Sequence, residues 1–149
     1  MNKLQKEIIL ELVAAQASSD GGKDIYKELW ETTGFIDDFE YGYPAKDYHI
    51  QRAITLIRKN KSNNVKFYYN VKFDKTYCSF YNSENTYLYI VYFNIQIEGK
   101  RYQISFHTLH RINDVMNDFE IKSKSCSTRW NKKVNSRDTA LELLHLLSE

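Results

Sequence analysis

The hydrophobic periodicity of the chain changes once, near residue 60, and this change most constrains the fold. Upstream of it, residues 3–17 repeat apolar side chains at helical spacing, as Leu4, Ile8 and Leu12 show. Downstream of it, apolar and polar side chains alternate over residues 65–73, the pattern of a half-buried strand. Helical and strand segments that are segregated along a chain predict an α+β protein.

The other segments follow the same two patterns. Helices are expected over residues 23–32, 45–60 and 137–147, with Gly34 ending the first and Ser136 capping the last. Strands are expected over residues 65–73, 76–81, 87–97 and 101–107. Their short connections require antiparallel pairing, because parallel strands need long crossovers. The expected fold is one α+β domain over residues 1–149, with N-terminal helices, a four-stranded antiparallel β-meander and a C-terminal helix packed on the sheet. Trp30, Phe106 and Trp130 are assigned to its core.

Composition argues against several classes of protein. The chain has 149 residues, of which 42% are hydrophobic, enough to bury a core. No apolar run approaches the roughly 20 residues of a membrane helix, and no apolar segment of a secretory signal follows the N-terminus. The two cysteines, Cys78 and Cys126, make no disulfide framework. We therefore expect no membrane association and a cytoplasmic location in the host cell.

Motifs for catalysis and cofactor binding are absent from the sequence. It contains no Gly-rich phosphate loop and no nucleotide fingerprint, so no cofactor, catalytic residue or metal site is assigned. His107, His110 and Cys126 are residue types that bind metals, but their spacing matches no standard zinc pattern. His107 as the general base of a small nuclease is a third-ranked alternative, because it needs a partner that sequence does not place.

The charge is unevenly divided along the chain. Residues 1–50 carry 5 basic and 10 acidic side chains, whereas residues 51–149 carry 16 basic and 9 acidic ones, for a net charge of +2. Acidic and aromatic residues are mixed within residues 37–47. We predict that this segment binds a partner protein, with carboxylates imitating phosphates and tyrosines as rigid anchors. The predicted partner-binding residues are Asp37, Asp38, Glu40, Tyr41, Tyr43 and Asp47.

The strands suggest a different ligand, single-stranded DNA or RNA. Tyr68, Tyr69, Tyr77, Tyr81, Tyr87, Tyr89 and Tyr92 lie in the strand region near Lys66, Lys72, Lys75 and Arg101. Exposed aromatic rings stack on bases while cations hold phosphates. A second basic segment is predicted to extend such a surface through Lys122, Lys124, Arg129, Lys132 and Lys133. Tyrosine is also common on half-exposed sheets without any ligand, so this interpretation is the alternative.

The segment Gln103-Ile104-Ser105-Phe106-His107, with Trp130-Asn131 further along, resembles small uncharacterised proteins of phages and mobile elements. Those proteins share a Gln-x-Ser-Phe-His segment followed by Trp and then Asp or Asn. The resemblance covers about residues 87–131 and implies a phage or mobile-element origin. Small proteins of this origin without catalytic motifs include inhibitors of host defence, among them anti-CRISPR proteins that block Cas9. The leading hypothesis is therefore a non-enzymatic inhibitor that contacts a host defence nuclease of the Cas9 type.

Overall fold

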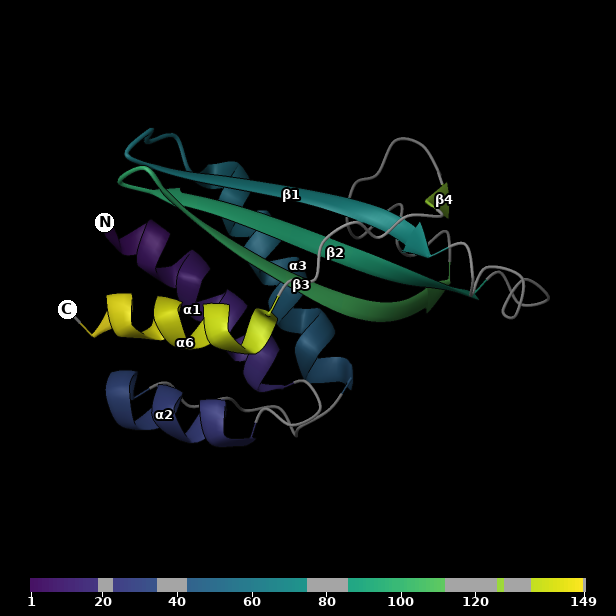
Figure 1. The fold of residues 1–149 in the computed structure, drawn as a ribbon, viewed down its shortest axis with the longest axis horizontal. Helices are drawn as coiled ribbons and strands as arrows, with labels where there is room; N and C mark the ends of the chain where they lie inside the picture. The colour runs from purple at the N-terminus through teal and green to yellow at the C-terminus, as the bar shows by residue number, and fades with distance from the viewer. Residues whose placement is uncertain (19–22, 35–42, 75–85, 112–125, 128–134, 149) are drawn as a thin grey trace.

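A computed structural model describes residues 1–18, 23–34, 43–74, 86–111, 126–127 and 135–148 (Figure 1). Its helices are α1 (Lys3–Ala17), α2 (Lys23–Thr33), α3 (Tyr43–Lys59) and α6 (Ser136–Leu147). Its strands are β1 (Val65–Asp74), β2 (Thr86–Ile97), β3 (Lys100–Arg111) and the two-residue β4 (Cys126–Ser127). The predicted α+β class is confirmed. The predicted strand over residues 76–81 lies outside the described residues.

The sheet has the order β3-β2-β1-β4. The three long strands pair antiparallel, whereas β4 pairs parallel with the end of β1, where Phe73 faces Cys126. Glu98 and Gly99 form the two-residue turn between β2 and β3, with φ of 50° and 81°. Positive φ at both turn residues matches the right-handed twist of the flanking strands, and glycine adopts it without steric cost.

Helices cover one face of this sheet. Alternate residues of β2 and β3, including Phe93, Ile95, Ile104 and Phe106, are buried on that face. They pack in one cluster with side chains of the helices, such as Ile8. The strict alternation along each strand sends the intervening side chains to the opposite face, which no described helix covers.

Helix α1 lies at the centre of the helical layer and packs against α2, α3 and α6. Its buried side chains cover most of its circumference, because Ala14 and Ala15 are buried as well as the larger apolar residues. A helix that is apolar nearly all round is stable only when other elements surround it. Near its N-terminus the buried Gln5 donates to Oδ1 of Asn64, 2.7 Å away, and so joins α1 to the turn before β1.

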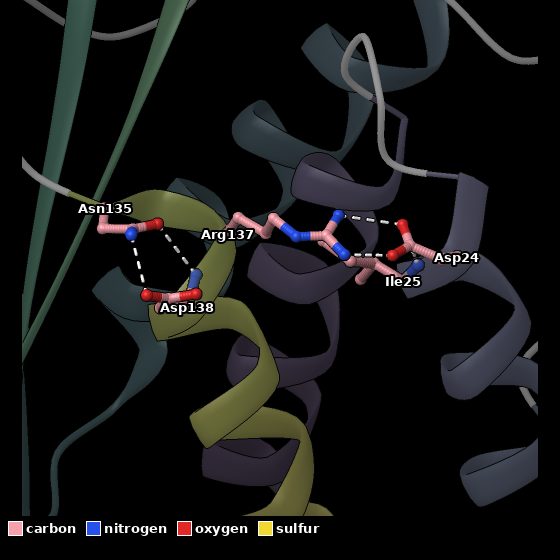
Figure 2. Close-up of polar contacts among 5 residues, drawn as sticks. All are labelled: Asp24, Ile25, Asn135, Arg137 and Asp138. Atoms are coloured by element: carbon pink, nitrogen blue, oxygen red, sulfur yellow. Dashed lines mark hydrogen bonds and ion pairs between the residues drawn. The ribbon is translucent and has the colours of Figure 1, made fainter.

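Helix α2 forms the outer part of the helical layer, farthest from the strands in Figure 1. It packs through Ile25 and Leu29, which are fully buried. At its first turn the Asp24 carboxylate accepts two hydrogen bonds from the Arg137 guanidinium of α6 (Figure 2). The predicted stop at Gly34 is confirmed, since its N–H donates to the Trp30 carbonyl with φ of 70°.

Two sequence expectations need correction. Trp30 is not a core residue, because 52% of its side chain is exposed, whereas Phe106 is buried as expected. Trp130 lies outside the described residues. Ser136 is not the cap of the last helix but its first residue. Asn135 is the N-cap, and its side chain accepts a hydrogen bond from the backbone N–H of Asp138 (Figure 2).

Among the described residues, no helix is both long enough and apolar enough to cross a membrane.

Candidate nucleic-acid interface

The face of the sheet opposite the helices carries a three-by-three array of polar and aromatic side chains, which we call the central patch. The pairing of β1 with β2 and of β2 with β3 places these side chains in three rows. The rows are Lys66–Gln96–Arg101, Tyr68–Asn94–Gln103 and Asn70–Tyr92–Ser105. Neighbouring strands lie about 4.8 Å apart and same-face residues about 6.8 Å apart along a strand, so the patch measures roughly 10 by 14 Å.

The central patch is cationic and carries no carboxylate. Lys66 and Arg101 are exposed and stand at two corners of the patch, and none of its nine side chains is acidic. The next position on this face of β2, Ile90, is buried, so the patch ends there on β2. A surface with cations at one side and aromatic rings further in suits a single-stranded nucleic acid, whose bases stack on the rings while the cations hold its phosphates.

Tyr68 is the most exposed aromatic residue of the patch, with 52% of its surface accessible. Its neighbour Tyr69 points to the opposite face, packs against the core and lies 6.4 Å from Phe93 between ring centroids. Nη2 of Arg58 donates to the hydroxyl oxygen of Tyr69 over 3.0 Å. The sequence-based grouping of these two tyrosines in one surface is therefore wrong, because alternation separates them.

Tyr92 and Asn94 occupy the central strand of the patch and are both half-buried. Burial raises the pKa of the Tyr92 hydroxyl above its usual range, so at neutral pH it stays a neutral phenol that both donates and accepts. The Oδ1 atom of Asn94 is buried and accepts no hydrogen bond from any described residue. A buried acceptor without a donor costs free energy, so its presence in the middle of the patch calls for an explanation.

The other tyrosines of the strand region are not placed in the patch. Tyr77 and Tyr81 lie outside the described residues. Tyr87 and Tyr89 belong to β2. Only Tyr68 and Tyr92, of the seven tyrosines grouped from the sequence, are therefore described members of this surface.

The predicted acidic binding segment is only partly described. Tyr43 is the first residue of α3, and Asp47 is half-buried in its second turn. Asp37, Asp38, Glu40 and Tyr41 lie outside the described residues. The predicted partner-binding site therefore stays a prediction.

The predicted basic segment also lies outside the described residues, which include none of Lys122, Lys124, Arg129, Lys132 and Lys133. His107, the candidate base, is exposed on the open face of the sheet. Its carbonyl oxygen accepts a hydrogen bond from Nζ of Lys46, which links β3 to α3. Within the described part of the chain, no three His, Cys, Asp or Glu side chains are grouped so that they could hold a metal ion.

A second polar cluster lies inside the helical layer. His49 of α3 is 2% exposed, and its Nδ1 lies 2.6 Å from Oε2 of Glu11 in α1. Glu11 is also close to Arg52, whose Nε is 3.6 Å from Oε1. The sequence alone did not signal this pair, since the two residues are 38 positions apart. Both partners are largely buried, which gives the pair a structural rather than a ligand-binding geometry.

No protein family, curated protein or solved structure matches this chain. The structure defines its class as an α+β protein with helices on one face of an antiparallel sheet and a polar, aromatic patch on the other.

Proposed function

We propose that this chain is a non-enzymatic binding protein whose central patch holds single-stranded nucleic acid. The observation that carries the proposal is the composition of the patch, where Lys66 and Arg101 accompany the exposed ring of Tyr68 and no acid is present. Base stacking on Tyr68 would supply affinity that depends little on sequence, and the two cations would hold phosphates. This activity belongs to the cytoplasm of a host cell.

The exposed ring of Tyr68 favours a single strand over a duplex. A base can stack on an aromatic ring only when it is unstacked from its neighbours, which single strands allow. The patch spans roughly 10 by 14 Å, enough for about two nucleotides.

Salt dependence provides the test. The affinity of a labelled oligonucleotide of about 12 nucleotides would be measured by fluorescence anisotropy between about 50 and 300 mM salt. Each phosphate contact contributes about −0.7 to the slope of log K against log salt, so two contacts give about −1.4. Arg101→Gln should weaken binding and make the slope shallower by about 0.7.

A matched control is available one residue away. Lys100 carries the same charge, but its Nζ lies 3.3 Å from Oε2 of Glu142 on the helix side of the sheet. Lys100→Gln should therefore leave both affinity and slope unchanged. Equal effects of Lys100→Gln and Arg101→Gln, or binding that ignores salt, would reject the central patch as the interface.

The second candidate is the inhibitor of a host defence nuclease that the resemblance around Gln103–His107 implies, with a phage or mobile-element origin. The observation that favours it is Trp30, which is 52% exposed on α2 beside the exposed Glu28 and Glu31. Tryptophan is enriched among residues that dominate binding energy in protein interfaces, and flanking carboxylates suit a basic partner.

An inhibition assay tests this candidate. Cleavage of target DNA by a purified Cas9-type nuclease would be timed with and without the protein. Trp30→Ala should abolish inhibition, whereas Lys27→Ala on the same helix should preserve it. Undiminished cleavage in the presence of the unmodified protein, or full inhibition by Trp30→Ala, would exclude α2 as an inhibitory surface for that nuclease.

A further inference from the structure

We propose that the outer edge of β1 is an interaction surface whose partner is β1 of a second copy of this chain. The two strands pair antiparallel about a two-fold axis at Tyr68 and join the two sheets into one. This inference goes beyond the proposed function, because the contact is made by the edge of the sheet and needs no nucleic acid.

The strand register shows which backbone groups of β1 point away from the sheet. In β3 the N–H and the carbonyl of Ser105 both bond the hydroxyl of Ser136, so they face the outer edge. Backbone groups alternate in direction along an antiparallel strand, and the register carries this alternation from β3 through β2 to β1. The outward-facing residues of β1 are therefore Val65, Phe67, Tyr69 and Val71. In agreement, the Val65 carbonyl accepts a hydrogen bond from Nδ2 of Asn60, which lies outside the sheet, over 3.3 Å.

The two outer strands of the three long ones, β1 and β3, differ in how their edges are covered (Figure 1). Along β3, side chains of α6 and α3 bond outward-facing groups in the middle of the strand. Along β1, no described residue bonds the outward-facing groups of Phe67, Tyr69 and Val71. The strand contains no proline, and its register with β2 runs from Val65 to Phe73 without a bulge. A straight edge with unpaired backbone groups is a template for another strand.

The side chains beside this edge favour a strand of alternating pattern. Phe67, Tyr69 and Val71 are half-buried against the core on the helix face. An added strand covers their exposed parts when it places apolar side chains on that face and polar ones on the open face. β1 itself has this pattern, because the intervening Tyr68 and Asn70 are exposed. A second copy therefore supplies a matching strand, and a two-fold axis lets each copy cover the other.

The available length of the edge determines the register. Beyond Val71 the edge is occupied, because Phe73 pairs with Cys126 of β4. The available edge is therefore residues 65–71. Two antiparallel copies use all of it only when Tyr68 lies opposite Tyr68 of the second copy, and they then form about eight backbone hydrogen bonds.

The same register avoids opposing like charges. With the axis at Tyr68, Lys66 faces the uncharged Asn70 of the second copy. An axis at Tyr69 would instead place Lys66 opposite Lys72, and like charges directly opposite each other destabilise a strand pair. At the axis, the two copies of Tyr68 form a pair that is not hydrogen-bonded through the backbone, so their Cα atoms lie about 4.5 Å apart. Aromatic pairs at such positions stabilise a sheet.

Sedimentation equilibrium of the nucleic-acid-free protein tests the pairing. One strand pair buries less than the roughly 1,200 Å² of a stable interface, so the dimer should be weak and form between about 10 and 500 µM. The mean mass should rise over this range from that of a monomer towards that of a dimer. A mass that stays monomeric throughout would overturn the pairing and leave the proposed function intact.

A charge placed on the axis tests which surface is used. Tyr68→Lys puts two like charges opposite each other and should keep the protein monomeric. Gln103→Lys adds the same charge to the same face two strands away, and it should leave dimerisation unchanged. Melting temperatures would confirm that both variants are folded. A dimer that persists in Tyr68→Lys would reject the edge of β1 as the interface.

Disulfide formation tests the register. Tyr68→Cys should link two copies under mild oxidation, because the Cα separation at the axis is within the range of roughly 4.4–6.8 Å that a disulfide spans. Asn70→Cys should not, since Asn70 lies four residues, about 13 Å along the strand, from Asn70 of the second copy. Mass spectrometry would identify the linked residues, because the chain also contains Cys78 and Cys126. Links through Asn70→Cys as frequent as those through Tyr68→Cys would overturn an axis at Tyr68.

Discussion

Nδ1 of His49 lies 2.6 Å from Oε2 of Glu11, and this contact joins α3 to α1 inside the helical layer. The imidazole is 2% exposed and the carboxylate 12% exposed, so water competes little for the hydrogen bond. Removing one partner of such a pair leaves the other desolvated and without this hydrogen bond. The pair therefore fixes how the two helices meet more strictly than their apolar contacts alone would.

Glu11→Leu is expected to lower the free energy of unfolding by about 2–3 kcal/mol, since His49 loses its acceptor. Urea denaturation would measure the change. The double variant Glu11→Leu/His49→Leu should be less destabilised than the sum of the two single variants, because it removes both polar groups together. Additive effects would mean that the two residues are not energetically coupled. Arg52→Gln serves as the control, with an expected change of less than about 0.5 kcal/mol for an exposed cation.

The contact between Asp24 and Arg137 predicts a pH dependence of stability. The hydrogen bonds from the Arg137 guanidinium lower the pKa of Asp24 to about 2, from its usual 3.8. The ionised form therefore stabilises the folded chain above about pH 4, and this contribution disappears as the pH falls towards 2. Both side chains are exposed, so the effect is small and depends on salt.

Denaturation midpoints would be compared between pH 6 and about pH 2.5. Asp24→Asn should have a lower denaturation midpoint than the unmodified protein at pH 6. This difference in midpoint between the two proteins should become smaller as the pH falls. Arg137→Gln should behave in the same way, because either substitution removes the same pair. If the difference in midpoint between variant and unmodified protein grew as the pH fell, the Asp24–Arg137 pair would not be the source of the pH dependence.

The neighbouring tyrosines of β1 offer a matched pair of variants. Tyr68→Ala should change stability by no more than about 0.5 kcal/mol, since the ring is exposed. The same variant should weaken oligonucleotide binding by about 1–3 kcal/mol through lost stacking. Tyr69→Ala should instead destabilise the fold by about 2–3 kcal/mol, because this ring packs against the core. Melting curves and anisotropy titrations would be measured on both variants. If Tyr68→Ala and Tyr69→Ala changed stability and binding to the same extent, the separate roles of the two tyrosines would be contradicted.

Ser136 covers part of the outer edge of the sheet. Its hydroxyl accepts from the backbone N–H of Ser105 over 3.0 Å and donates to the Ser105 carbonyl over 2.9 Å. Ser136→Ala should therefore destabilise the protein by about 1–2 kcal/mol, since two partly buried backbone groups lose their partner. Ser148→Ala, at the exposed end of the same helix, should have almost no effect. Hydrogen exchange at the Ser105 amide would show directly whether Ser136 protects it.

The Ser136–Ser105 contact lies within the segment Gln103–His107. Ile104 and Phe106 are buried in the core, whereas Ser105 is held at the edge by Ser136. Gln103 belongs to the central patch, and His107 is exposed on the same open face. Within five consecutive residues, the side chains thus alternate between the core and the open face, and the backbone at Ser105 contacts a helix. This arrangement is typical of an edge strand beside a helix.

Local patterns in the sequence were enough to predict most elements of the fold. The helix expected over residues 3–17 begins and ends where α1 does, because capping and apolar spacing are properties of adjacent residues. The strand expected over residues 65–73 matches β1 to within one residue for the same reason. Trp30 was misassigned, since an apolar residue in an amphipathic helix need not lie on its buried face.

The candidate site could be predicted only in part. The sequence drew attention to Tyr68, Tyr92, Lys66 and Arg101, which the structure brings into one patch. It gave no indication that Asn94 lies at the centre of the patch with a buried oxygen that no described residue pairs. Both properties depend on how three strands align, and no single stretch of sequence carries that information.

The sequence by itself determined the α+β class, the approximate positions of the main helices and strands, and the alternation that makes each strand two-faced. Helix and strand periods are local consequences of backbone geometry, so a short window of residues suffices to recognise them. Only the tertiary structure decided that α1 is enclosed by three helices, that Glu11 meets His49, and that Asn94 lies between Tyr68 and Gln103. Those relationships join residues distant in the chain, and they arise from packing and strand register rather than from local preference.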